Sequence, residues 1–204
     1  MKIIGIGKNY VNDTSEISAV KTGAQTIFTK PESTLVTDNK DITFPKITNK
    51  LAYEVELVAK IGKQGKDIAL SDAESYISEI AVGIDYTATD VLATSREKKG
   101  PWDLAKGFDG ASPISAFKSV SEFPDLSAIN FDLKINGDSK QIGHTSLMIY
   151  SFAEIISYVS SFMTLEVGDL IFTGTPATGK GLNVKGDHLQ AAIEGELLLD
   201  FKLV

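Results

Sequence analysis

Two glutamates separated by a single residue could do chemistry together. Glu54 and Glu56 lie in the segment 51–61, in which apolar residues largely alternate with charged ones. This alternation predicts a β-strand, and residues two apart in a strand lie on the same face. Two adjacent carboxylates repel each other, so a divalent cation with oxygen ligands would stabilise the pair. The alternative, which is the more common one for an isolated pair, is a solvated strand face.

The composition narrows the classes of protein that need to be considered. The chain has 204 residues, 43% of them hydrophobic, which predicts one globular domain spanning 1–204. It has no cysteine, which excludes disulfides, thiolate zinc sites and a cysteine nucleophile. A formal net charge of −7 argues against nucleic acid as a partner. No signal peptide or membrane-length apolar run is visible, so we expect no membrane association and a cytoplasmic location.

The elements that must position the glutamates are mostly strands. Periodicity and turn signals predict short helical segments within 11–20 and over 71–79, 87–98 and 151–163, a possible hairpin over 36–45, and a loop over 102–110. The strands are not separated by regular helices, which argues against a doubly wound parallel sheet and favours an α+β, mainly β fold. The remaining strands are expected at 2–6, 26–29, 80–84, 112–117, 129–135, 138–142, 170–173, 188–193 and 196–203. Asn136-Gly137 is a strong signal for a hairpin turn between 129–135 and 138–142.

One of these strands ends at a third acidic residue. The segment 80–84 is entirely apolar, which predicts a buried strand, and Asp85 follows it directly. Later in the chain, the expected loop 102–110 contains Lys106, and Gly174 and Thr175 precede a proline. Taken alone, Lys106 could be an ordinary surface lysine, and Gly174-Thr175 could be an ordinary turn.

Three motifs in order along the chain resemble those of the fumarylacetoacetate hydrolase family. They are Tyr53-Glu-Val-Glu56, the segment 83–88 (Gly-Ile-Asp-Tyr-Thr-Ala) and Thr173-Gly-Thr-Pro176. The resemblance covers nearly the whole chain and is strongest to the short, single-domain acylpyruvate hydrolases and oxaloacetate decarboxylases. It implies mixed β-sheets that form a roll, three or four short peripheral helices, and a homodimer.

The resemblance also implies a metal-dependent active site. Glu54, Glu56 and Asp85 would be ligands of Mg²⁺ or Mn²⁺, which suits a hard cation that prefers oxygen ligands. Lys106 would stand near the metal and hold the carboxylate or enolate oxygen of a small α-keto acid. The metal would act as a Lewis acid and stabilise the enolate. The residues expected to bind the substrate are Lys8, Tyr10, Gly174 and Thr175.

Two positions depart from the pattern of the family. Its hydrolases activate water with a histidine and a glutamate three residues apart, and here Glu16 is retained while the histidine position is Asp13. Aspartate, with a reference pKa of about 3.9 against about 6.5 for histidine, is a weak base near neutral pH. An arginine that would grip the substrate is replaced by Thr89.

These retained and lost residues predict a divalent-metal-dependent enzyme acting on a small α-keto or β-diketo acid. Both acylpyruvate hydrolysis and oxaloacetate decarboxylation or tautomerisation would run through an enolate. The losses at Asp13 and Thr89 favour decarboxylation or tautomerisation, because neither needs an activated water. The candidates for catalysis in such an enzyme are Lys106, Glu16 and Asp13. The alternative, suggested by the changes at Asp13 and Thr89, is a degenerate family member that binds metal and keto acid with little catalysis. A purely structural or interaction module is a distant third possibility.

Overall fold

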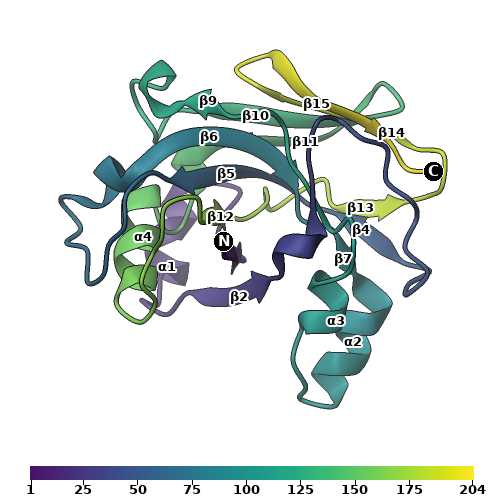
Figure 1. Ribbon diagram of the computed structural model, residues 1–204, viewed down its shortest axis with the longest axis horizontal. Helices are drawn as coiled ribbons and strands as arrows, with labels where there is room; N and C mark the ends of the chain where they lie inside the picture. Colours follow the sequence, from purple (N-terminus) through teal and green to yellow (C-terminus); the bar gives the residue numbers. More distant parts are fainter.

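The computed structural model describes residues 1–204 and contains strands in several sheets with four short α-helices at the periphery (Figure 1). The largest sheet is mixed, because β1 and β12 pair in parallel whereas all other neighbouring strands in this sheet pair antiparallel. Its order is β2 (Thr26–Lys30), β1 (Ile3–Gly7), β12 (Leu170–Phe172), β5 (Val55–Ile61), β6 (Ile77–Ile84) and β9 (Lys118–Ser119).

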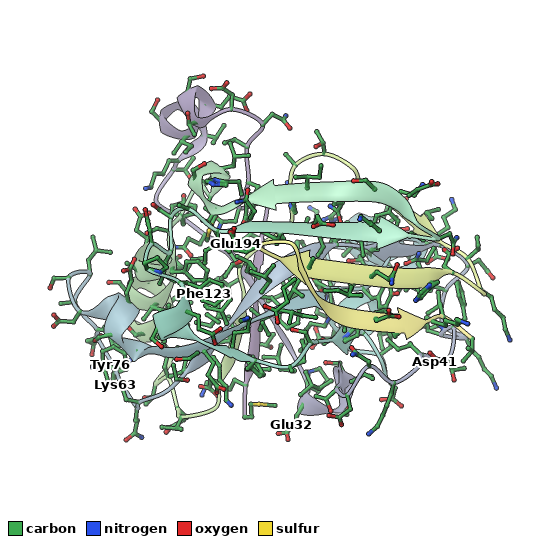
Figure 2. The ribbon with its side chains drawn as sticks, turned by 90° about the horizontal axis from the view of Figure 1, so that it is seen from above. Glu32, Asp41, Lys63, Tyr76, Phe123 and Glu194 are labelled. Atoms are coloured by element: carbon green, nitrogen blue, oxygen red, sulfur yellow. The ribbon has the colours of Figure 1, made fainter.

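A second, antiparallel sheet packs beside the first. Figure 2 shows its four strands lying side by side, with β14 and β15 in yellow. A two-residue turn at Asn136-Gly137, both at positive φ, joins β10 to β11 as the sequence predicts. The order is β11 (Asp138–His144), β10 (Asn130–Ile135), β14 (His188–Ile193) and β15 (Glu196–Lys202).

Two small sheets and the helices complete the structure. One small sheet has the order β13 (Gly181–Asn183), β4 (Leu51–Tyr53) and β7 (Thr87–Ala88), and the other pairs β3 (Leu35–Val36) with β8 (Ser112–Pro113). None of the helices has the length and apolar character needed to cross a bilayer. The helices are α1 (Ile17–Val20), α2 (Thr89–Glu97), α3 (Asp103–Lys106) and α4 (Phe152–Ser160), with 3₁₀ turns at Thr14–Glu16, Glu32–Thr34, Ala73–Tyr76, Val120–Glu122 and Thr145–Leu147.

One contiguous apolar core joins the two large sheets and α4. Helix α4 begins with a capping box formed by Ser151 and Glu154 and buries the side chains of Phe152, Ile155 and Val159. These positions are three and four residues apart, so they form one face that packs against the sheets. The predicted α+β, mainly β fold with mixed sheets and peripheral helices is therefore confirmed.

Several expected boundaries are wrong, and each error has a non-local cause. The segment 51–61 is not one strand: it is interrupted at Glu54, because β4 pairs with β13 and β7 whereas β5 pairs with β6 and β12. The helix expected over 71–79 is only the 3₁₀ turn Ala73–Tyr76, because pairing with β5 starts strand β6 at Ile77. Long-range pairing overrides local helix signals in this way.

Three further corrections concern loops. No hairpin forms over 36–45; instead Ile42 bridges to Leu203 at the end of the chain, and β3 pairs in parallel with β8. The strand expected over 112–117 is limited to two residues, Ser112–Pro113. The loop expected over 102–110 contains the helical turn α3, which ends at Lys106.

Asn9 fixes the ends of two neighbouring strands. Its side-chain amide donates hydrogen bonds to the carbonyls of Tyr150 (3.0 Å) and Thr173 (2.8 Å), and its Oδ1 accepts one from the Tyr150 N–H (2.8 Å). The residue is buried, so every polar atom of the side chain has a partner that would be costly to lose. Asn9 therefore ties the end of β1 to the end of β12 and to the start of α4.

The variant Asn9→Asp tests this role. A carboxylate cannot donate to the two carbonyls, so we expect the free energy of unfolding to fall by about 2–4 kcal/mol in urea titrations at neutral pH. Asn130→Asp provides the matched control, because Asn130 is exposed and its amide lies on the surface; its expected change is below about 1 kcal/mol. Equal losses in both variants would contradict the structural role of Asn9.

Candidate active site

Three carboxylates converge where the strands β4, β5 and β6 meet. One oxygen from each of Glu54, Glu56 and Asp85 lies within 4.8 Å of the others. Glu54 occupies the break between β4 and β5, and Glu56 is the second residue of β5. Asp85 follows the end of β6, which pairs antiparallel with β5, and its N–H donates to the Glu54 carbonyl at 2.8 Å. Strand pairing therefore brings three carboxylates together, of which the two-residue spacing in the sequence had indicated only Glu54 and Glu56.

Two buried lysines offset part of this negative charge. Lys30, at the end of β2, lies 2.6 Å from Asp85 Oδ1 and also donates to the Ala111 carbonyl at 2.6 Å. Lys106, at the end of α3, binds Asp85 and lies 2.8 Å from Glu54 Oε2. The side chains of Lys30 and Lys106 are 0% and 5% exposed, so the ion pairs are shielded from water.

Burial and charge act in opposite directions on the pKa values of these groups. Burial lowers the pKa of Lys30, although Asp85 works against this. Burial would also lower the pKa of Lys106, but the adjacent Asp85 and Glu54 raise it above its usual value. Burial would raise the pKa of Asp85, but Lys106 and Lys30 hold it below its usual value. Lys106 and Asp85 are thus kept ionised at neutral pH.

Glu56 is the carboxylate whose charge has the least compensation. It is 3% exposed, and burial followed by repulsion from Asp85 and Glu54 raises its pKa well above the usual value. Its only hydrogen bond comes from the Gly174 N–H to Oε2 at 2.8 Å, and none reaches Oε1. If all three carboxylates were ionised, the two ammonium groups would leave one negative charge uncompensated, and the raised pKa places this deficit at Glu56. This donor set of carboxylate oxygens fits a hard divalent cation.

The carboxylates face a cavity of about 280 Å³. Residues from β1, β2, α2, α3 and the loop after β12 surround it, and Figure 1 shows α2 and α3 standing together below β7. The aromatic rings of Phe28 and Trp102 contribute to its wall. Lys106 Nζ lies 4.8 Å from the centre of the Phe28 ring. Besides the three carboxylates, the lining includes Lys8, Phe28, Thr87, Thr89, Leu92, Arg96, Trp102, Lys106, Thr175 and Lys180.

Most of the predicted substrate-binding residues lie at this cavity. Lys8 and Thr175 line it, and the Thr175 hydroxyl accepts a hydrogen bond from the Gln141 amide at 2.9 Å. Gly174 lies beside it, at φ 100°, a conformation that favours glycine. Tyr10 is an exception: it is buried in the core, with its ring 6.0 Å from that of Phe131, and it does not line the cavity.

The structure does not bring the predicted water-activating residues to the carboxylates. Asp13 and Glu16 lie on the exposed 3₁₀ turn before α1, and neither lines the cavity. Asp13 accepts hydrogen bonds from the Ser15 hydroxyl (2.7 Å) and the Ser15 N–H (2.8 Å), which lower its pKa. Asp13 is therefore an even weaker base than a free aspartate, and a catalytic role for Asp13 or Glu16 stays a prediction.

Other residues of the site were not among the sequence-based candidates. The sequence assigned no role to Lys30, Trp102 or Gln141, which lie outside the three motifs that carry the family resemblance. A lysine at the end of an apolar strand and directly before a proline was the available signal for Lys30. Arg96 had no such signal, because only the packing of α2 shows that it lines the cavity.

Comparisons with known proteins point to one family. The model of the fumarylacetoacetate hydrolase C-terminal domain matches residues 2–200. The chain is 38% identical to the mitochondrial oxaloacetate tautomerase of Mus musculus over 98% of this chain and 90% of that protein. It is 36% identical to the mitochondrial oxaloacetate decarboxylase of Dictyostelium discoideum, over 95% of this chain and 89% of that protein.

A solved structure shows the same architecture. The crystal structure of fumarylpyruvate hydrolase from Pseudomonas aeruginosa in complex with Mn²⁺ and pyruvate superimposes with a TM-score of 0.89 at 33% identity. The similarity covers 100% of this chain and 90% of that one. The resemblance inferred from three short motifs is thereby confirmed, and the chain belongs to the fumarylacetoacetate hydrolase family of enzymes.

Proposed function

We propose that the protein is a divalent-metal-dependent enzyme that tautomerises or decarboxylates oxaloacetate or a closely similar α-keto acid. The observation that carries this proposal is the group of Glu54, Glu56 and Asp85, whose carboxylate oxygens converge and face a cavity beside Lys106. The names of the tautomerase and decarboxylase relatives support this choice of substrate.

The residues of the chain divide into two roles. Glu54, Glu56 and Asp85 would hold a divalent cation, either Mg²⁺ or Mn²⁺, which would supply Lewis-acid stabilisation of an enolate. Lys106 is held protonated, so its ammonium group can donate to the substrate oxygen on which negative charge develops. The wall formed by Phe28 and Thr175 limits the ligand to a small molecule.

The cavity favours enolate chemistry over hydrolysis. No histidine lines it, and Asp13 and Glu16, the residues expected to activate an attacking water, lie outside it. Keto–enol exchange and loss of CO₂ require stabilisation of the enolate but no such water. Hydrolysis of an acylpyruvate is the second candidate, because the relative from Pseudomonas aeruginosa is named a fumarylpyruvate hydrolase. A homodimer and a cytoplasmic location remain predictions.

Turnover assays with the purified chain test the proposal. With Mn²⁺ or Mg²⁺ we expect the enol–keto exchange or decarboxylation of oxaloacetate to exceed the metal-only rate by at least about 100-fold. Acetylpyruvate should be cleaved more slowly, and chelator should abolish both activities. No turnover of either acid above the metal-only rate would contradict the proposal. If calorimetry then still showed tight Mn²⁺ binding, the degenerate alternative would stand in its place.

A further inference from the structure

The chain has a single arginine, and this residue lines the active-site cavity. Arg96 lies on α2 with Leu92 and Thr89, four and seven residues before it, and all three contribute to the cavity wall. Residues at these spacings share one face of a helix. The arginine that the family resemblance places at position 89 is thus matched by one on the same face, two helical turns further along.

The direction of helical side chains brings Arg96 back toward the carboxylates. Two turns separate the backbones of Thr89 and Arg96 by roughly 10 Å. Side chains on a helix lean toward its N-terminus, and Thr89 is the first residue of α2. The long arginine side chain therefore extends from the outer part of the cavity toward Thr89. The threonine side chain is too short to fill the space that an arginine at position 89 would occupy.

The guanidinium group of Arg96 lies against the ring of Trp102. The Arg96 guanidinium carbon lies 4.9 Å from the centre of the Trp102 ring, and Trp102 also lines the cavity. Contact with an aromatic face occupies the flat side of a guanidinium and leaves its N–H edge free for a carboxylate. No hydrogen bond or ion pair within the chain uses that edge. Lys180, in the same wall, also lacks an ion pair.

The charges along the cavity match a ligand with two negative ends. The inner end has the three carboxylates, which suit a cation, together with Lys106, so it accepts the keto-acid end of a ligand. The outer part contributes Arg96 and Lys180, neither of which is neutralised by the protein. A second carboxylate on the ligand would complete the charge balance there, and arginine binds carboxylates through two parallel hydrogen bonds.

We propose that Arg96 is a specificity-determining residue that binds the second carboxylate of a keto diacid. The proposal rests on the proposed function, since it assumes that the keto-acid end binds at the metal. According to this proposal, the chain binds keto diacids in preference to keto monoacids of the same length. The residue of α2 that makes this distinction is at position 96 and not at position 89.

Binding of two non-cleaved probes tests the assignment. The probes 2-oxoglutarate and 2-oxopentanoate have five carbons each and differ in the terminal carboxylate. Calorimetry with the Mn²⁺-loaded chain should show the diacid binding at least about tenfold more tightly, as expected for a charged hydrogen-bonded pair. In Arg96→Met, which keeps an apolar stem beside Trp102, the two affinities should come within about twofold of each other.

Lys98→Met is the matched control. Lys98 is an exposed cation just beyond the same helix and does not line the cavity. It should keep the full preference for the diacid, and a loss equal to that of Arg96→Met would overturn the proposal in favour of general attraction by positive charge. An unchanged preference in Arg96→Met would overturn the assignment of Arg96 alone. Failure of the parent to bind either probe would overturn it together with the proposed function.

Discussion

Replacing Glu56 by glutamine is expected to abolish metal-dependent turnover and, in the same variant, to raise the thermal stability of the chelator-treated protein. Burial and the neighbouring Asp85 and Glu54 penalise the charged form of Glu56, as the raised pKa of its carboxyl group shows. A neutral amide removes this penalty. Its oxygen can still accept the hydrogen bond from the Gly174 N–H, so the local structure should be preserved.

The two effects are measured separately. Calorimetric titration should show the affinity for Mn²⁺ reduced by more than about 100-fold, because loss of a ligand should exceed the 10–100-fold cost of losing a group that only orients one. Scanning calorimetry in chelator should show a higher midpoint of unfolding, by roughly 2–4 °C for each 1 kcal/mol gained in a protein of this size.

Glu79→Gln serves as the control for Glu56→Gln. Glu79 is on the neighbouring strand β6, where it pairs with Lys60 at 2.6 Å and is 35% exposed. Its replacement should leave the affinity for Mn²⁺ unchanged and should not raise the unfolding midpoint. If Glu56→Gln bound Mn²⁺ as tightly as the parent, Glu56 would not be a ligand.

The second large effect is expected when the buried cation beneath the carboxylates is removed. In Lys30→Met the side chain keeps its approximate length but loses its charge and both hydrogen bonds, to Asp85 and to the Ala111 carbonyl. Breaking a buried ion pair on one side leaves an uncompensated charge, which costs about 3–5 kcal/mol. We expect urea unfolding at neutral pH to show a loss of this size, together with loss of activity.

A half-exposed ion pair provides the comparison for Lys30→Met. Lys60 is paired with Glu79 and is 34% exposed, so Lys60→Met should cost no more than about 1 kcal/mol. If the two lysine variants lost the same stability, the buried pair would make no special contribution. Addition of Mn²⁺ should not restore the stability of Lys30→Met to that of the parent, because Lys30 bonds to the backbone as well as to Asp85.

Local sequence patterns predicted the carboxylates better than the cations. The spacing of Glu54 and Glu56 and the apolar run before Asp85 are local features of the sequence, and the family motifs that contain them implied their role as ligands. Lys30 becomes part of the site only through the position of β2 beside β1, and Arg96 only through the packing of α2. Such contacts depend on residues far apart in the sequence, which periodicity does not record.

The errors in the predicted fold also arise from contacts between residues far apart in the sequence. The break at Glu54 arises because its two flanking segments pair with different sheets, although the alternation of residues continues through it. The catalytic expectation for Asp13 and Glu16 came from the family resemblance; the structure places this turn on the surface, and the expectation stays a prediction. Where the partner of a segment was its neighbour in the chain, as at the Asn136-Gly137 turn, the prediction was confirmed.

The position of β12 between β1 and β5 has a consequence for synthesis of the protein. This strand, Leu170–Phe172, pairs on one side with Ile3–Gly5, which the ribosome makes far earlier. Until it emerges, the nascent chain has two unpaired strand edges at the centre of its largest sheet, and the Gly174 N–H that binds Glu56 is missing. The active site can therefore be completed only after Gly174 has been synthesised, although Glu54, Glu56 and Asp85 are made much earlier.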